Sequence, residues 1–112
     1  MGPLCALRKD KIFIIFSEDD DRWLVVPGHK AVCPGQTVTW QVFGRPNTAR
    51  VDVKITLDAT VFETEHPTLE NGQAVAKVRD KAALGNYPYT VVCDGRPGFG
   101  GSHPSVIIDW GR

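Results

Sequence analysis

The feature that most constrains this sequence is a set of short segments in which apolar and polar side chains alternate. Thr37–Phe43 is one of them, and its apolar residues Val38, Trp40 and Val42 alternate with threonine and glutamine. Ala49–Leu57 alternates in the same way. A period of two residues is typical of a β-strand that turns one face to a core and the other to water.

The rest of the chain reads as further short strands between turns rich in glycine, proline and asparagine. No segment is long enough for the crossover helix that a parallel α/β fold needs, and Arg79–Leu84 accepts a helix but is too short to form one alone. The sequence therefore predicts an all-β fold, a Greek-key antiparallel β-sandwich of seven to eight strands, with residues 1–112 forming one domain. We expect strands over Lys11–Phe16, Trp23–Val26, Lys30–Cys33, Thr37–Phe43, Ala49–Leu57, Gln73–Val78, Tyr87–Cys93 and Ser105–Trp110. Asp58–Gly72 is expected to be irregular, with Val61 and Phe62 as an optional short strand within it.

The alternation also predicts which side chains are buried. Within each expected strand, the residues on one face should meet in a single core between two sheets. The expected core consists of Phe13, Ile15, Val38, Trp40, Val42, Val51, Val53, Ile55, Tyr89, Val91, Val106 and Ile108.

Charge and composition exclude several classes of partner. The 13 basic and 13 acidic residues cancel, and the basic ones are not clustered, so neither nucleic acid nor an anionic membrane is expected to bind. The sequence begins without a basic segment followed by a long apolar one, and Ile12–Phe16 is too short to span a membrane. A cytoplasmic protein is expected, unless a leader was removed before residue 1.

The three cysteines, Cys5, Cys33 and Cys93, are an odd number without regular spacing. Such a set does not indicate a disulfide framework, so we expect buried, reduced thiols that pack as small apolar side chains. A bridge between Cys33 and Cys93 that joins two sheets is the alternative.

The segment Gly95–His103 is the candidate binding site. It holds glycine, proline and serine around two large side chains, Arg96 and Phe99, and it ends at His103. We expect a hairpin loop that displays these three residues, because recognition usually resides in loops set on a rigid scaffold. A phosphate site is not expected, because phosphate-binding loops lead into a helix N-terminus and this one leads into a strand.

Two stretches of the sequence carry a family resemblance. Pro34–Trp40 (P-G-Q-T-V-T-W) resembles a strand of the cupredoxins, and Gly85–Tyr89 (G-N-Y-P-Y), followed by Cys93 and His103, is similar to their C-terminal part. Immunoglobulin-like domains share the second pattern. In those sandwiches the tyrosine hydrogen-bonds back to the main chain, a role that Tyr87 would take here.

The cupredoxin resemblance implies a type 1 copper site with Cys93 as the thiolate and His103 as one imidazole ligand. A second histidine is missing after the strand that bears Trp40, and no methionine follows His103. The resemblance therefore implies the scaffold without a complete copper site, and no cofactor is expected.

We predict a non-enzymatic binding or structural module with a protein partner, acting through its end loops or an edge strand. Self-association through an edge strand is included in this prediction. The alternative is a copper-binding electron carrier that uses Cys93 and His103. A thiol hydrolase built on the same two residues is less favoured, because Cys93 continues the buried face of a strand and no catalytic residue can be assigned.

Overall fold

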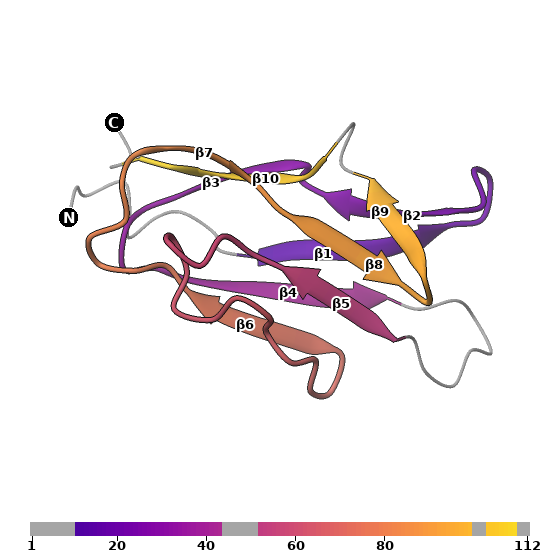
Figure 1. Ribbon diagram of the computed structural model, residues 1–112. Helices are drawn as coiled ribbons and strands as arrows, with labels where there is room; N and C mark the ends of the chain where they lie inside the picture. Colours follow the sequence, from indigo (N-terminus) through magenta and orange to yellow (C-terminus); the bar gives the residue numbers. More distant parts are fainter. Residues whose placement is uncertain (1–10, 44–51, 100–102, 110–112) are drawn as a thin grey trace.

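The computed structural model describes residues 11–43, 52–99 and 103–109, and within these ranges the chain forms ten strands and no helix (Figure 1). No helix long and apolar enough to cross a bilayer occurs in this part of the chain. The strands are β1 (Lys11–Ser17), β2 (Arg22–Val26), β3 (His29–Val32), β4 (Thr37–Phe43), β5 (Val53–Thr56), β6 (Gln73–Lys77), β7 (Gly85–Pro88), β8 (Thr90–Cys93), β9 (Arg96–Phe99) and β10 (Ser105–Ile108).

The strands form two sheets. The larger has seven strands in the order β5-β8-β9-β2-β1-β4-β6, and the smaller has three in the order β3-β10-β7. In Figure 1 the three-stranded sheet lies above β1, β4 and β6. The predicted all-β sandwich is confirmed. It differs from the expectation in having ten strands and three parallel pairings, β1 with β4, β2 with β9 and β3 with β10.

One of the added strands arises because Tyr87–Cys93, expected as a single strand, is divided at Tyr89. Before this residue, β7 pairs with β10 in the smaller sheet. After it, β8 pairs with β5 in the larger sheet. The main-chain N–H of Tyr89 donates to the carbonyl of Pro104 at 2.9 Å, which holds the chain at the crossing point. The same stretch of backbone therefore belongs to both sheets.

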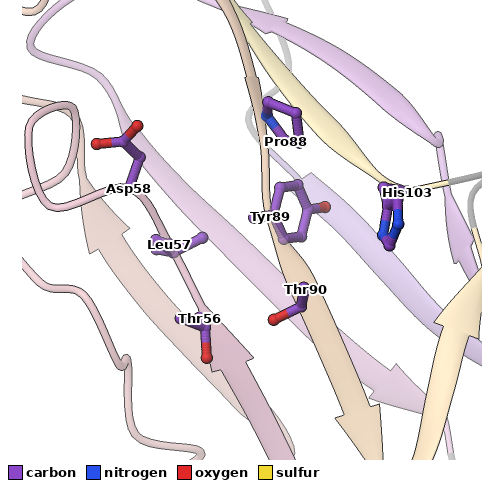
Figure 2. Close-up of a pocket in the computed structure, with 7 residues that line it drawn as sticks. All are labelled: Thr56, Leu57, Asp58, Pro88, Tyr89, Thr90 and His103. Carbon is purple, nitrogen blue, oxygen red and sulfur yellow. The ribbon is translucent and has the colours of Figure 1, made fainter.

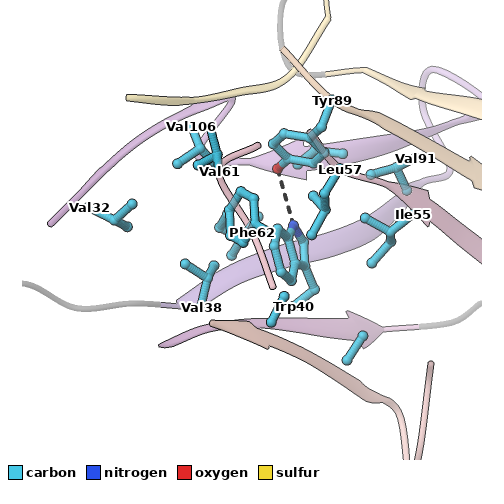
Figure 3. Close-up of a cluster of buried hydrophobic side chains, with 14 of the residues drawn as sticks. Val32, Val38, Trp40, Ile55, Leu57, Val61, Phe62, Tyr89, Val91 and Val106 are labelled. Atoms are coloured by element: carbon cyan, nitrogen blue, oxygen red, sulfur yellow. Dashed lines mark hydrogen bonds between the residues drawn. The ribbon is translucent and has the colours of Figure 1, made fainter. Parts of the chain in front are cut away.

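The core lies between the two layers and is centred on Trp40 (Figure 3). The Trp40 ring packs against Tyr89 and Phe62, with ring centroids 5.7 and 6.1 Å away. Its indole N–H donates to the Tyr89 hydroxyl at 3.2 Å, and burial raises the pKa of that hydroxyl to about 12. Of the predicted core, the residues found buried are Val38, Trp40, Ile55, Tyr89, Val91, Val106 and Ile108.

The core prediction is wrong for the first strand. Ile12 and Ile14 are buried in β1, whereas Phe13 is half-buried and Ile15 is 36% exposed. The five apolar residues Ile12–Phe16 show no alternation within the strand, and only Lys11 and Ser17 at its two ends mark the face of Phe13 and Ile15 as the outer one.

Three further residues were predicted to be in the core and were not found fully buried there. Val42 and Val53 are half-buried and pack against the core from its edge. Val51 lies outside the described residues.

The segment before β6 covers the free edge of that strand. Phe62 forms an isolated bridge with Val78, and the N–H of Glu63 donates to the carbonyl of Lys77 at 2.9 Å. At the other end of β6, Glu70 and Gln73 exchange both main-chain hydrogen bonds. A sheet edge closed in this way offers little to a further strand.

Two local predictions concern the cysteines and Tyr87. Cys33 is disulfide-bonded and Cys93 is a free, buried thiol, so the expectation of reduced thiols is wrong for Cys33 and a Cys33–Cys93 bridge is not formed. Cys5, the remaining cysteine of the chain, lies outside the described residues. The Tyr87 hydroxyl donates to the main-chain carbonyl of Ala83 at 2.8 Å, as predicted for a tyrosine at this corner.

Candidate functional site

Cys93 ends β8 inside the core. It pairs with Val53 of β5 on one side and Arg96 of β9 on the other. Burial raises the pKa of its thiol to about 12, and the negative charge of the neighbouring Asp94 adds to the shift. The thiolate is the form that attacks electrophiles and binds metals, so a thiol held protonated at neutral pH is suited to neither role.

His103 is exposed and lies at a different place. It lines an open hollow of about 400 Å³ with Thr56, Leu57, Asp58, Pro88, Tyr89 and Thr90, a set that does not include Cys93. Figure 2 shows Tyr89 in the middle of this hollow, with His103 on one side and Thr56 and Leu57 on the other.

The polar groups of the hollow do not converge. The Asp58 carboxylate accepts hydrogen bonds from the N–H and the hydroxyl of Thr60, which lower the pKa of Asp58. A specific ligand site needs a few polar groups aimed at one point. The hollow is therefore a weak candidate for a small-molecule site.

A copper centre does not fit the described residues. Within the described ranges, no group of three or more His, Cys, Asp or Glu side chains is placed to bind a metal. A type 1 site needs a thiolate and two imidazoles converging on one ion. The two residues that the resemblance suggested as ligands do not come together in such a group.

A serine–histidine pair that the sequence did not suggest lies between β3 and β10. His29 Nδ1 is 2.6 Å from Ser105 Oγ, and the two residues are register neighbours in the parallel pairing. Ser105 is only 2% exposed. A nucleophile must reach its substrate, so this pair is a link between two strands rather than a catalytic dyad.

The expected hairpin loop over Gly95–His103 is wrong for residues 96–99, which form β9. Arg96 donates to the main-chain carbonyl of Asp21, and its guanidinium lies 3.5 Å from the Asp21 carboxylate. It also lies over the Phe16 ring, 5.9 Å from the centroid. Arg96 therefore connects β9 to the turn between β1 and β2.

The glycine that suggested a loop here has another role. A Cβ at Gly98 would lie 3.1 Å from Val25 Cγ2 and 3.4 Å from Val91. Gly98 is buried because β9 approaches these two strands closely, and a larger residue would force them apart. The absence of a side chain allows packing rather than mobility.

Phe99 lies on the opposite side of β9, where it is 37% exposed. The strand register places it in a row with residues of three neighbouring strands, Leu24 of β2, Ile15 of β1 and Phe43 of β4. Phe43 is 47% exposed. The row therefore runs across four strands on the outer side of the larger sheet.

A second, shorter row lies beside the first. Phe13 of β1 is paired with Val26 of β2, which is 45% exposed. The Phe13 and Phe43 rings are in contact, with centroids 5.8 Å apart. We call the six residues of both rows the apolar face; they are Phe13, Ile15, Leu24, Val26, Phe43 and Phe99.

The pattern of alternation did not reveal this surface, for a definite reason. It assigned Phe13 and Ile15 to the core, which removed two central residues from the outside of the sheet. The signal that could have found the surface is the run of apolar residues from Ile12 to Phe16, since one sheet face cannot bury them all.

Comparisons with known proteins give a likeness of fold. No protein family and no curated protein sequence matches this chain. Similar solved structures include a mutant of amicyanin in its reduced Cu(I) form, with a TM-score of 0.49 and 16% identity over 90% of this chain and 84% of that one. Plastocyanin from Dryopteris crassirhizoma has a TM-score of 0.48 and 13% identity, over 87% of this chain and 99% of that one. A cysteine protease inhibitor from Entamoeba histolytica has a TM-score of 0.45 and 15% identity, over 90% and 99%.

TM-scores of 0.45 to 0.49 are too low for these likenesses to assign this chain to a family. Identities of 13 to 16% carry no information about ligands or partners. The function has to be argued from the surface of this chain itself.

Proposed function

We propose that this protein is a non-enzymatic binding module that recognises another protein through the apolar face. The observation that carries the proposal is the row Phe99, Leu24, Ile15 and Phe43, in which Ile15, expected in the core, is 36% exposed, Phe43 is 47% exposed and Phe99 is 37% exposed. Contiguous exposed apolar patches on a folded domain usually mark an interaction surface. With neighbouring strands about 4.8 Å apart, the row extends roughly 14 Å between its outermost Cα atoms.

The strands that carry the apolar face are held rigidly by the core behind them. The six side chains project from β-strands whose opposite faces are buried in the core, at Ile14, Trp23 and Trp40 among others. Little ordering of the chain is then needed when a partner binds, which favours affinity. Recognition is thus assigned to the outer surface of the larger sheet instead of to a loop. Phe99 is part of this surface, whereas Arg96 has a structural role.

The structure also bears on three other expectations, which concern catalysis, self-association and the cellular compartment. The protonated, enclosed Cys93 and the separation of His103 from it support a function without catalysis. Self-association through an edge strand stays a prediction, and the closed edge of β6 speaks against that strand. The disulfide at Cys33 favours an oxidising compartment over the cytoplasm that was expected, because cytosolic thiols are kept reduced.

The binding function can be tested by site-specific photocrosslinking in an extract of the cells that produce the protein. With p-benzoylphenylalanine in place of Phe43, we expect a discrete adduct heavier than the chain, and the adduct should be lost when Ile15→Ser is added. The same label in place of Asn86, which is exposed on β7 of the other sheet, is the matched control. Equal labelling at both positions, or none at either, would contradict the proposal.

The copper alternative has its own test. We expect that adding Cu(II) to the folded protein gives no intense visible absorption, because Cys93 is protonated and has no two imidazoles beside it. Absorbance titration across the visible range, where thiolate-to-copper charge transfer absorbs, measures this. An intense band that disappears in Cys93→Ser would establish the copper site and refute the expectation.

A further inference from the structure

This inference rests on the proposed function and concerns the identity of the partner. Charge is distributed unevenly along the apolar face, in the direction of the strands β1 and β2. At one end lies the turn Glu18–Asp21, which joins these strands and consists of four consecutive acidic residues. At the other end Lys11 begins β1, is exposed, and points to the same side as Phe13 and Ile15, since side chains two residues apart share a face. The two ends of the apolar face therefore differ in charge.

The acidic end keeps a negative charge after its own ion pairs are counted. Arg22 lies 3.9 Å from the Asp20 carboxylate. Arg96 lies 3.5 Å from the Asp21 carboxylate. The other two carboxylates of the turn are exposed and form no ion pair with the residues that the structure describes. Two guanidiniums thus offset two of four carboxylates, and the remaining two can meet a cation of a partner.

The middle of the apolar face carries no carboxylate. None of the ten strands that the structure describes contains Asp or Glu. Leu24 and Val26 project from β2, the middle strand of the larger sheet, and Phe13 and Ile15 project from β1 beside it. An apolar centre bordered by polar residues is the usual layout of a protein–protein interface.

We propose that the apolar face binds the apolar face of a second copy of this chain, with the two β1 strands antiparallel across a two-fold axis. Two sheets of the same twist pack face to face with their strands within about 30° of each other. An axis over Ile14 and Val25, between the two rows, brings Phe13 of one copy against Ile15 of the other. The same axis brings Leu24 of one copy against Val26 of the other.

The antiparallel arrangement also brings together the ends of opposite charge. Residues at equal distances on either side of Ile14 face each other, so Lys11 of one copy lies over Ser17 of the other, next to Glu18. The two Lys11 side chains are then about six residues or roughly 20 Å apart, well beyond the Debye length of about 8 Å. A parallel arrangement would instead place Lys11 over Lys11 and one acidic turn over the other. Charge complementarity therefore selects the antiparallel arrangement.

The size of the surface fits a weak dimer. The larger sheet has seven strands of four to seven residues. With about 4.8 Å between strands and about 3.4 Å per residue, its outer side covers roughly 400–700 Å². A standard interface buries about 800 Å² per partner, and transient complexes bury less. We therefore expect a dimer that dissociates on dilution, with a dissociation constant of roughly 10 μM or above.

Other occupants fit the two ends of the face less well. A partner bordered by charges of one sign would be attracted at one end and repelled at the other. An anionic membrane would meet the turn Glu18–Asp21, and its electrostatic recognition takes about four to eight clustered Lys or Arg residues. The described strands of this face provide no such cluster. A second copy presents one end of each sign, at the spacing that the first copy requires.

Sedimentation equilibrium of the purified chain at low salt tests the inference. Between about 5 and 500 μM, a range suited to weak interfaces, we expect the mean mass to rise from 12.3 kDa toward twice that value. Ile15→Ser should weaken the dimer at least about tenfold, because the serine hydroxyl would be buried against apolar side chains. A chain that stays at 12.3 kDa throughout would overturn the inference.

An exchange of charges tests the antiparallel arrangement. Lys11→Glu alone should weaken the dimer at least about tenfold, since carboxylates then oppose each other at both symmetric contacts. Glu18→Lys alone should weaken it similarly, since ammonium groups then oppose each other. An equal mixture of the two variants should dimerise like the original chain, because each contact of the mixed dimer again joins opposite charges. A mixture that recovers nothing would overturn the inference.

The matched control is Lys81→Glu mixed with Glu65→Lys, two charge reversals at exposed positions outside the strands. Neither variant alone nor their mixture should differ from the original chain in mean mass. If Lys11→Glu or Glu18→Lys does not fold, as judged by circular dichroism, crosslinking supplies the test. With p-benzoylphenylalanine in place of Phe43, the purified chain should form an adduct of twice its own mass, and the absence of this adduct would overturn the inference.

Failure of this inference is distinguishable from failure of the proposed function. If the purified chain stays monomeric while the Phe43 label captures one other protein in the extract, the second copy is wrong and the binding function remains. If the chain stays monomeric and the label captures nothing, both proposals fail. A dimer that survives Ile15→Ser forms through another surface and would overturn the inference. Binding of a monomeric chain to vesicles of phosphatidylserine and phosphatidylcholine would overturn it as well.

Discussion

Replacing Trp40 by alanine is expected to lower the free energy of unfolding by about 3–5 kcal/mol. Trp40 is 0% exposed and packs between the rings of Phe62 and Tyr89, so truncation leaves a cavity in the centre of the core. It also removes the indole N–H that donates to the Tyr89 hydroxyl. A buried hydroxyl without a partner adds a further cost. Urea unfolding followed by circular dichroism measures the change.

The control variant is Tyr89→Phe, which removes the hydrogen bond and keeps both rings. We expect it to cost about 1–3 kcal/mol, the penalty for leaving a buried polar group unpaired. A domain of this size has a total stability of about 5–15 kcal/mol, so Trp40→Ala can fall near the folding limit, and Trp40→Phe then supplies the measurement. A change below roughly 1 kcal/mol for Trp40→Ala would mean that this residue is not the centre of the core.

The second large effect concerns Cys93. With its pKa raised from 9.0 to about 12, the fraction of thiolate at pH 7 falls by about three powers of ten relative to an ordinary cysteine. We therefore expect alkylation by iodoacetamide at least about a thousandfold slower than that of glutathione. The rate should rise tenfold per pH unit without levelling off below pH 11. Mass spectrometry of the labelled chain over time gives the rate.

Unfolding supplies the control. In guanidinium without reductant, Cys93 should label at the rate of a free thiol, while Cys33 stays unlabelled because it is disulfide-bonded. Rapid labelling of Cys93 in the folded protein would show that the thiol is accessible and ionised. It would also reopen the thiol chemistry that the sequence allowed.

The strands that could be predicted most accurately are those with polar residues on one face. Thr37–Phe43 was expected and found with identical bounds, because threonine and glutamine mark its outer side. Lys11–Phe16 was expected as a strand and found as β1, but its buried face was misassigned since all five residues from Ile12 to Phe16 are apolar. Periodicity identifies an element readily. It identifies the buried face only where the two faces differ in polarity.

Other features depend on contacts between distant segments and could not be predicted. Gly98 was expected in a hairpin loop because its contact with Val25, far away in sequence, could not be read from the segment. The disulfide at Cys33 was missed since spacing does not reveal which cysteines meet in space. The division of Tyr87–Cys93 between two sheets depends on where β10 and β5 lie, and neither can be read from the segment itself.

The candidate site was predicted in part. Phe99 was singled out as a large side chain available for recognition, and it is exposed. Its neighbours on the apolar face come from three other strands, and only the register of the sheet brings Leu24, Ile15 and Phe43 into line with it. Arg96 was singled out for the same reason as Phe99, yet it is bound to Asp21. The sequence thus indicated a region, and the pairing of strands determines its composition.

The passage of Tyr87–Cys93 from one sheet to the other has a consequence for motion. Because a single backbone segment supplies hydrogen bonds to β10 and then to β5, neither layer can shift or peel away while the other stays intact. Fluctuations short of complete unfolding should then be confined to the turns. A docking partner would meet the same rigid surface at every encounter, so selectivity would come from the partner's own shape and charge instead of from adjustment by this chain.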